Sequence, residues 1–131
     1  YRLIVKNIER TGDHAVLITK DLLEFKRPIK NNIMEKIEDL NNFAVSVLDQ
    51  ACLALFKEDF NLAELAIRRA SDASKYEKKM LESIKSIKDE EEAYRIRRMS
   101  ENIIRIAEYA SDIAEIVLNM NIEKLLKKPK L

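Results

Sequence analysis

Apolar side chains recur at alternating steps of three and four residues through the last third of this chain. The members of this repeat are Ile96, Met99, Ile103, Ile106, Ala110, Ile113, Val117 and Met120. This spacing places all of them on one stripe of an α-helix, because two helical turns take about seven residues. A strand would need alternation at every second residue. The repeat therefore predicts one long helix that packs through a single continuous face.

Similar patterns earlier in the chain predict three more helices. The 131 residues include one glycine and two prolines, and 36% are charged, which leaves little turn chemistry for β-hairpins. We expect helices at residues 3–26, 32–57 and 61–84, and a fourth after Asp89. Short turns between such helices make neighbours antiparallel. The fold class is therefore predicted to be all-α, an up-down bundle of four long helices.

Capping residues mark the expected helix starts. Asn32 and Asn61 are each followed three residues later by a glutamate, as in a capping box. Asp89 is expected to cap the fourth helix, because three glutamates follow it where the helix dipole favours negative charge. Pro28 is expected to stop the first helix, since proline cannot continue the hydrogen-bond ladder. The residues from Lys124 onward are expected to form a frayed basic tail.

The first helix carries two apolar stripes. One is expected to pack against the bundle. Its members are Ile4, Ile8, Thr11, Ala15, Ile18, Leu22 and Phe25. The other stripe, with Val5, Val16 and Leu23, would then be exposed. Exposed apolar stripes favour association, so we predict a homodimer that covers this stripe.

Charge and composition exclude several classes of protein. Lys and Arg number 24 against 23 Asp and Glu, so a net charge of +1 gives no overall attraction to nucleic acid. Basic residues between positions 68 and 98 alternate with acids, as on a solvated, salt-bridged face; a docking surface for an acidic partner or a membrane is the alternative. No apolar run approaches the roughly 20 residues of a membrane span. The lone Cys52 lies in an apolar run, which favours a cytoplasmic, reducing compartment.

Two acidic motifs share one pattern, Glu-x-x-(Gly or Ser)-Asp-x-Ala. Glu9 and Asp13 occupy it near the start of the chain, and Glu108 and Asp112 occupy it near the end. Residues four apart stack on a helix, so each copy places two carboxylates on one strip beside a small residue. Carboxylates from two neighbouring helices would suit Mg, Mn or Fe. The simpler alternative is a solvated face of ordinary surface acids.

Enzymatic chemistry has little support in the sequence. Di-iron bundles use Glu-x-x-His on two helices, whereas this chain has one histidine, His14, with no glutamate three residues before it. His14 also follows Asp13 directly, so it points about a hundred degrees away from the acidic strip and is expected to have a packing or surface role. We predict that the protein is not an enzyme, with a carboxylate-bridged di-iron enzyme as the alternative.

The two motifs resemble the signature of the PhoU family of phosphate-uptake regulators. Residues 8–15 read Ile-Glu-Arg-Thr-Gly-Asp-His-Ala, and residues 105–115 resemble the archaeal form of the same signature. The resemblance implies three-helix repeats, two of which form a six-helix domain. Residues 1–28 would then be the last helix of a preceding repeat, 29–126 one complete repeat, and 127–131 a basic tail.

The resemblance also implies a metal site, because the repeated acidic motifs of the family bind clusters of iron or other metals. The motif positions are Glu9, Asp13, Glu108 and Asp112. Fe, Zn, Mn or Mg ions are therefore the expected cofactors. Family members add acids from a neighbouring helix; here Asp72 and Glu77 could contribute, opposed by Lys75.

The function implied by the resemblance is non-enzymatic. The chain would regulate phosphate uptake or phosphate signalling through contacts with a phosphate transporter or signalling protein. It begins at Tyr1 within a helical pattern, so we expect a piece of a longer protein. Archaeal relatives often carry an AbrB-type DNA-binding hairpin domain before such a bundle. The alternative is therefore a helical oligomerisation module of a transcriptional regulator, with no nucleic-acid binding by this fragment itself.

Overall fold

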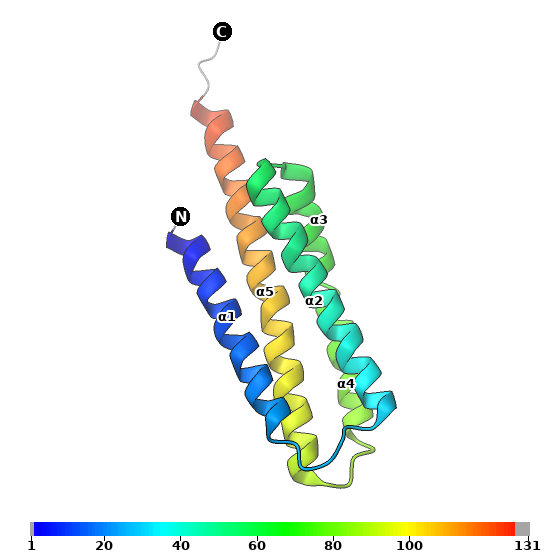
Figure 1. Ribbon diagram of the computed structural model, residues 1–131. Helices are drawn as coiled ribbons and strands as arrows, with labels where there is room; N and C mark the ends of the chain where they lie inside the picture. Colours follow the sequence, from blue (N-terminus) through cyan, green and yellow to red (C-terminus); the bar gives the residue numbers. More distant parts are fainter. Residues whose placement is uncertain (1, 128–131) are drawn as a thin grey trace.

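A computed structural model describes residues 2–127 and shows a bundle of α-helices (Figure 1). The helices are α1 (Arg2–Leu23), α2 (Asn31–Lys57), α3 (Phe60–Ala70), α4 (Ala73–Ile84) and α5 (Glu90–Lys127). α3 and α4 follow one another along α2 and α5, in the place predicted for one helix. The all-α, up-down bundle is confirmed, but the predicted third helix is divided into α3 and α4. None of the described helices is long and apolar enough to cross a bilayer.

The break between α3 and α4 forms without glycine or proline. Ser71 Oγ donates to the carbonyl oxygen of Arg68 at 2.6 Å, and the Asp72 N–H donates to the carbonyl oxygen of Arg69 at 3.0 Å. Short polar side chains that bond nearby backbone groups compete with the regular helical ladder. The tighter turn that results separates the two helices and corrects the prediction of one continuous third helix.

The core lies where α2, α3, α4 and α5 meet. Near the loop that joins α4 to α5, large side chains fill it: Leu40, Met80, Ile96, Met99 and Ile103 are each at most 1% exposed. At the other end the helices meet through alanines. These are Ala51, Ala54, Ala63, Ala66, Ala110 and Ala114, all 0% exposed. Small side chains at the contact let helices approach closely, so this end of the core has no room for larger residues.

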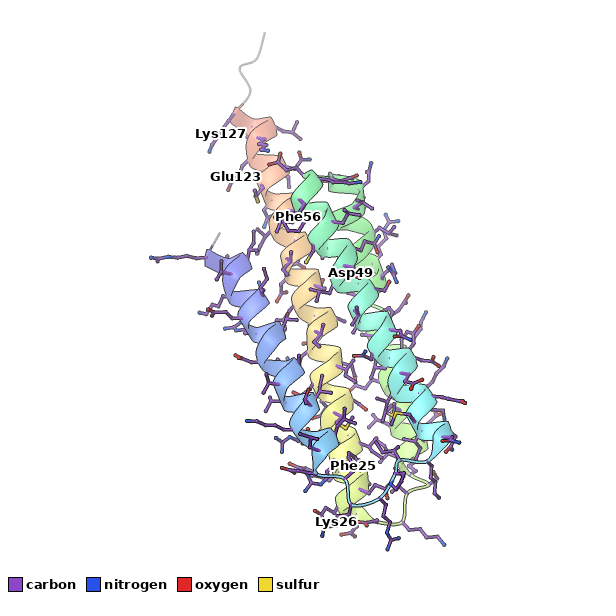
Figure 2. The ribbon with its side chains drawn as sticks, in the orientation of Figure 1. Phe25, Lys26, Asp49, Phe56, Glu123 and Lys127 are labelled. Carbon is purple, nitrogen blue, oxygen red and sulfur yellow. The ribbon has the colours of Figure 1, made fainter. Side chains whose placement is uncertain are left out.

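The long apolar repeat of α5 is confirmed as its packing face. Every member from Ile96 to Val117 is at most 5% exposed, and Met120 is half-buried. Beyond this face α5 continues past the ends of α2 and α3, where Glu123 and Lys127 lie on its last turns (Figure 2). The helix therefore extends further than the predicted start of the tail at Lys124, and residues 128–131 of the predicted basic tail lie outside the described part of the chain.

α1 packs chiefly against α5, along the side that α2, α3 and α4 leave free (Figure 1). The predicted packing stripe of α1 is wrong in part, because Ile8 is 51% and Leu22 42% exposed. The face turned inward is instead largely polar. It comprises Ile4, Asn7, Thr11, His14, Ile18 and Asp21. The prediction of a second, exposed apolar stripe is confirmed, since Val5, Val16 and Leu23 are 54%, 53% and 81% exposed.

Two of the predicted helix boundaries need correction in the first half of the chain. α1 ends at Leu23, five residues before Pro28, so the proline does not end it. The linker that follows is held to the core by Phe25 and Ile29, which are partly buried. α2 begins at Asn31 with Lys30 as its N-cap and no capping side chain, so the capping role predicted for Asn32 is wrong.

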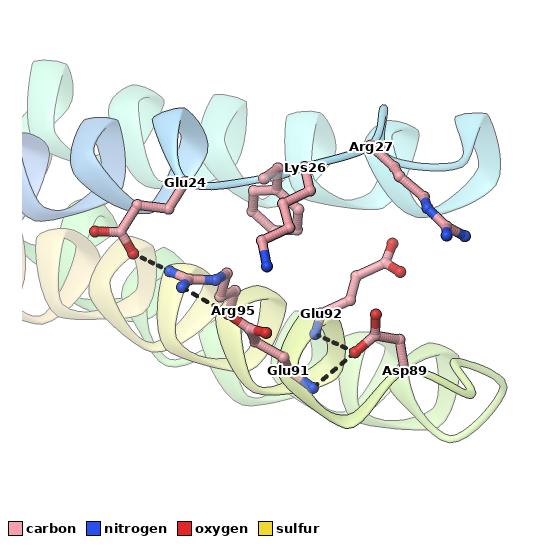
Figure 3. A pocket seen from close by; sticks show the side chains of 8 residues that line it. Glu24, Lys26, Arg27, Asp89, Glu91, Glu92 and Arg95 are labelled. Atoms are coloured by element: carbon pink, nitrogen blue, oxygen red, sulfur yellow. Dashed lines mark hydrogen bonds and ion pairs between the residues drawn. The ribbon is translucent and has the colours of Figure 1, made fainter.

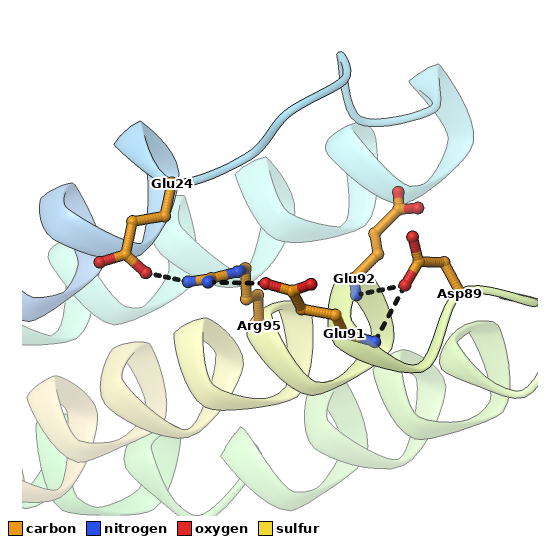
Figure 4. A network of polar contacts seen from close by, with 5 residues as sticks. All are labelled: Glu24, Asp89, Glu91, Glu92 and Arg95. Atoms are coloured by element: carbon orange, nitrogen blue, oxygen red, sulfur yellow. Dashed lines mark hydrogen bonds and ion pairs between the residues drawn. The ribbon is translucent and has the colours of Figure 1, made fainter.

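Aspartates cap the later helices. Asp59 Oδ1 accepts a hydrogen bond from the Leu62 N–H at 3.1 Å, so Asp59 starts α3 and the prediction for Asn61 is wrong. Asp89 is confirmed as a cap, because its Oδ1 accepts from the N–H groups of Glu91 and Glu92 at 3.0 and 3.3 Å (Figure 4). An aspartate at this position satisfies free N–H groups and complements the helix dipole.

Candidate functional site

The four predicted metal ligands lie on the surface, on two helices. Glu9 and Asp13 are exposed on α1, and Glu9 borders a shallow hollow formed by α1 residues alone. Glu108 and Asp112 are exposed on α5 and share a hollow with residues at the end of α3. The structure therefore keeps each motif pair together on its own helix, as the four-residue spacing requires, but Glu9 lines a different hollow from Glu108 and Asp112.

Glu108 also borders a second hollow, which crosses α5 between α1 and α4. Its lining residues are His14, Glu77, Glu101, Asn102, Ile104, Arg105 and Glu108. Of the two acids expected to add to the site, Glu77 is therefore the one that shares a hollow with Glu108. Asp72 instead forms an ion pair with Lys75 at 3.3 Å. The positive charge of Lys75, which is expected to oppose a metal site, therefore compensates Asp72 rather than Glu77.

The carboxylates do not form a closed metal cluster within one chain. Among the described residues, no three His, Cys, Asp or Glu side chains converge as an ion would need. Glu108 accepts a hydrogen bond from Arg105 at 2.9 Å, which already compensates its charge. Three or more protein ligands are usual for a tightly held ion. The residues of a single chain therefore do not fit such a cluster, and the assignment of the four carboxylates as metal ligands stays a prediction.

The surroundings of Asp112 disfavour its charged form. Burial raises the pKa of the Asp112 carboxyl, the neighbouring Glu108 carboxylate raises it further, and Arg10 on α1 partly lowers it. Two stacked acids repel each other unless a cation lies nearby. The α5 strip therefore has an electrostatic preference for positive charge, which the Arg10 guanidinium meets only in part.

His14 has a packing role rather than a free position at the acidic strip. Its Nδ1 lies 2.6 Å from Asn102 Oδ1, and its Nε2 lies 3.1 Å from the Tyr109 hydroxyl. Because the amide oxygen can only accept, Nδ1 carries a proton, and in the neutral ring Nε2 accepts from Tyr109. Both ring nitrogens thus bridge α1 to α5. The sequence offered a signal for this pair, because Asn102 and Tyr109 lie two turns apart beside the apolar stripe of α5.

A charged network fastens the start of the α1–α2 linker to α5. The Arg95 guanidinium contacts Glu24 on one side and donates to Glu91 at 3.0 Å on the other (Figure 4). It borders a small pocket in which acids and bases face each other (Figure 3). The charged lining residues are Glu24, Lys26, Arg27, Asp89, Glu91, Glu92 and Arg95. The mixture favours neither an anion nor a cation, so we interpret the network as structural.

Several of the basic residues between positions 68 and 98 form ion pairs of the kind predicted for a salt-bridged surface. Arg68 contacts Glu64 at 3.0 Å, and Arg98 contacts the buried Asp21 at 3.4 Å. Arg69 instead donates to Gln50 and Ser46 of α2, both at 2.6 Å, and so joins α3 to α2. Much of this charge is therefore used within the bundle.

Cys52 is expected to react slowly with alkylating reagents. Burial raises the pKa of its thiol, and the charge of Asp49 raises it further. Less thiolate is then present at a given pH, and the thiolate is the nucleophile. We expect iodoacetamide to modify Cys52 more slowly than free cysteine, and Asp49→Asn to speed the reaction by lowering the pKa. Asp39→Asn, also exposed on α2, is the control; equal rates for both variants would refute the role of Asp49.

A model of the PhoU domain family matches residues 37–117, which is more than half of the chain. The chain belongs to the PhoU domain family. A search of curated proteins and a search of solved structures each found no match. The resemblance suggested by the two motifs is thus confirmed at the level of the family.

The PhoU match covers most of α2, all of α3 and α4, and the packing face of α5. It includes the second acidic motif, with Glu108 and Asp112, and ends before the last turns of α5. α1 and the first motif lie outside it. The division of the chain at residues 1–28, 29–126 and 127–131 stays a prediction.

Proposed function

We propose that this PhoU domain protein is a non-enzymatic regulator of phosphate uptake or phosphate signalling that acts through protein–protein contacts. The match of residues 37–117 to the PhoU domain family carries the proposal, because this family suggests a role in the regulation of phosphate uptake. Exposed apolar side chains provide surface for such contacts. They include Leu53 at 43% and Phe56 at 82%, both on α2. Figure 2 shows Phe56 near the end of this helix.

Site-specific photo-crosslinking in the host tests this proposal. A photoreactive amino acid at position 53 or 56 is expected to capture a component of a phosphate transporter or phosphate sensor. The control is position 119, an exposed polar residue of α5, Asn119. Capture of such a component only from the apolar positions supports regulation by contact. Capture of proteins unrelated to phosphate, or equal capture from all three positions, contradicts it.

We further propose that two copies associate through the exposed stripe of α1. The stripe runs from Val5 to Leu23 over about 27 Å of helix, at about 1.5 Å per residue. Gly12 lies within it, and a side-chain carbon added there would meet nothing within 4 Å. A second helix can therefore approach this part of α1 closely, and burying the stripe would remove apolar surface from water.

A charge placed in this stripe is expected to break the dimer. Val16→Glu puts a carboxylate where the second copy would bury it, so the mass from light scattering should fall by about half. Val45→Glu adds the same acid at an exposed valine of α2, away from the α1 stripe, and is the control. A monomeric wild-type chain, or a dimer that survives Val16→Glu, would refute this contact.

Metal binding is a separate proposal, supported by the two copies of the acidic motif. If Glu108 and Asp112 hold Fe, Zn, Mn or Mg, the ion should raise the melting temperature of the wild-type chain, because binding to the folded state stabilises it. Glu108→Ala should remove this rise, whereas Glu115→Ala, an exposed acid of the same helix, should retain it.

Elemental analysis of the purified chain complements the titration. Unchanged melting with all four ions, together with no bound metal, would refute the metal site. The same data distinguish the helical oligomerisation module, which needs association but no ion. A dimer without metal and without any effect on phosphate uptake would favour that alternative.

A further inference from the structure

α5 has two contact surfaces of opposite character. Toward α2, α3 and α4 it presents isoleucines, methionine and alanines that are almost completely buried. Toward α1 it meets a mixed face. Asn7 is 7% and Asp21 2% exposed, Thr11 and His14 are half-buried, and the apolar members are Ile4, 5% exposed, and the half-buried Ile18. Burial of apolar area is the main favourable term in helix packing. The contact with α1 therefore gains less free energy than the almost wholly apolar contacts of the rest of the bundle.

Two of the inward polar side chains of α1 do not hold α5 at all. Asn7 Nδ2 donates to the carbonyl oxygen of Leu3 at 2.9 Å, and Thr11 Oγ1 donates to the carbonyl oxygen of Asn7 at 2.8 Å. Both bonds lie within α1 and persist if it leaves α5. Little hydrogen bonding is then lost at these positions when water replaces α5.

The remaining polar contacts are ones that water can replace at small cost. His14 bonds Asn102 and Tyr109. Asp21 lies 3.4 Å from the Arg98 guanidinium, and its Oδ2 has no hydrogen-bond partner although the residue is buried. A buried carboxylate in one long ion pair regains hydration when it is released, which offsets the lost Coulombic attraction.

We propose that α1 is a reversible arm, which leaves α5 while α2–α5 stay folded. Ile18 on α1 and Phe25 in the linker both pack on the main core. Release of the arm breaks the Ile18 contact, while Phe25 keeps the linker attached beyond Leu23, where α1 ends. Release uncovers Asn102 and Tyr109. It also removes His14, one wall of the hollow that contains Glu108, so a ligand of that hollow requires the docked arm.

Hydrogen–deuterium exchange of the full chain tests this proposal. Amides in α1 are expected to exchange on the order of 100-fold faster than those in the centre of α5, because local opening precedes global unfolding. The same measurement on the Val16→Glu chain removes any protection that a second copy provides. Exchange of α1 that is as slow as exchange in the centre of α5 in both chains would overturn the arm.

A triple variant tests whether the polar contact is the cause. His14→Leu with Asn102→Leu and Tyr109→Phe removes all three hydrogen-bonding partners, so none of them is left unpaired. We expect α1 to exchange about 10-fold more slowly in this variant, with exchange in α2–α4 unchanged. Equal or faster exchange of α1, with helix content preserved by circular dichroism, would show that the polar seam does not make the arm labile.

Discussion

Replacing Ile103 by alanine is expected to lower the free energy of unfolding by about 2–5 kcal/mol. Ile103 is 1% exposed and belongs to the core cluster that joins α5 to α2 and α4. The change removes buried apolar atoms and leaves a cavity that rigid neighbouring helices fill only in part. Urea denaturation followed by circular dichroism measures the loss.

The control for this change lies on the same helix. Ile122 is 49% exposed near the end of α5, so Ile122→Ala should alter the free energy of unfolding by no more than about 0.5 kcal/mol. Equal losses for the two variants would mean that the 3-4 repeat of α5 does not mark the core. A small loss for Ile103→Ala would mean the same.

Ala114→Leu should destabilise the protein by about 1–3 kcal/mol, for the opposite reason. Ala114 is 0% exposed, among alanines of α2, α3 and α5 that leave no room for a larger side chain. Three extra carbon atoms must move a helix or force a side chain off its preferred rotamer. The midpoint of urea unfolding should fall accordingly.

The internal repeat supplies a matched control for Ala114→Leu. Ala15 ends the first acidic motif as Ala114 ends the second, but it is exposed on α1. Ala15→Leu should therefore change the free energy of unfolding by at most about 0.5 kcal/mol. If both variants lose stability equally, the two copies of the motif do not have the different environments described for them.

The sequence predicts α5 and the bundle well because the apolar spacing is compatible with only one kind of element, a helix that packs through one face. Eight apolar positions in unbroken 3-4 spacing can only be one helix face, and that face is the core. Asp89 is equally clear, because a capping aspartate before three glutamates combines two favourable effects. Asn32 and Asn61 are each followed three residues later by a glutamate, as in a capping box, but neither caps a helix. The N-cap residues of α2 and α3 are Lys30 and Asp59.

The break near Ser71 is invisible to apolar spacing. It depends on hydrogen bonds of Ser71 and Asp72 to the backbone, which hold a tighter turn without changing the order of apolar residues. Periodicity over longer windows therefore joins α3 and α4 into one predicted helix.

α1 shows why the packing face could not be chosen from sequence alone. It carries an apolar stripe with Ile8 and a mostly polar stripe with His14, and the usual preference selects the apolar one. The polar stripe faces inward because α5 offers Asn102 and Tyr109 as partners. Such complementarity depends on which residues meet in three dimensions.

Part of the candidate site could likewise be predicted from the sequence, and part of it could not. Four-residue spacing correctly places Glu108 beside Asp112, and the pKa of Asp112 is raised first by burial and then by the Glu108 charge. Spacing also allows the ion pair of Arg105 with Glu108, which lie three residues apart, but it cannot show that Glu77 rather than Asp72 shares a hollow with Glu108. The family match on residues 37–117 supports the functional proposal independently of these details.

Uptake of labelled phosphate by the host tests regulation of phosphate transport most directly. Cells that lack this protein should take up phosphate at a different rate from wild-type cells when phosphate is plentiful. Re-expression of the wild-type chain should restore the original rate, whereas the destabilised Ala114→Leu chain should restore it only in part. Identical uptake with and without the protein, at both high and low phosphate, would contradict a role in phosphate regulation.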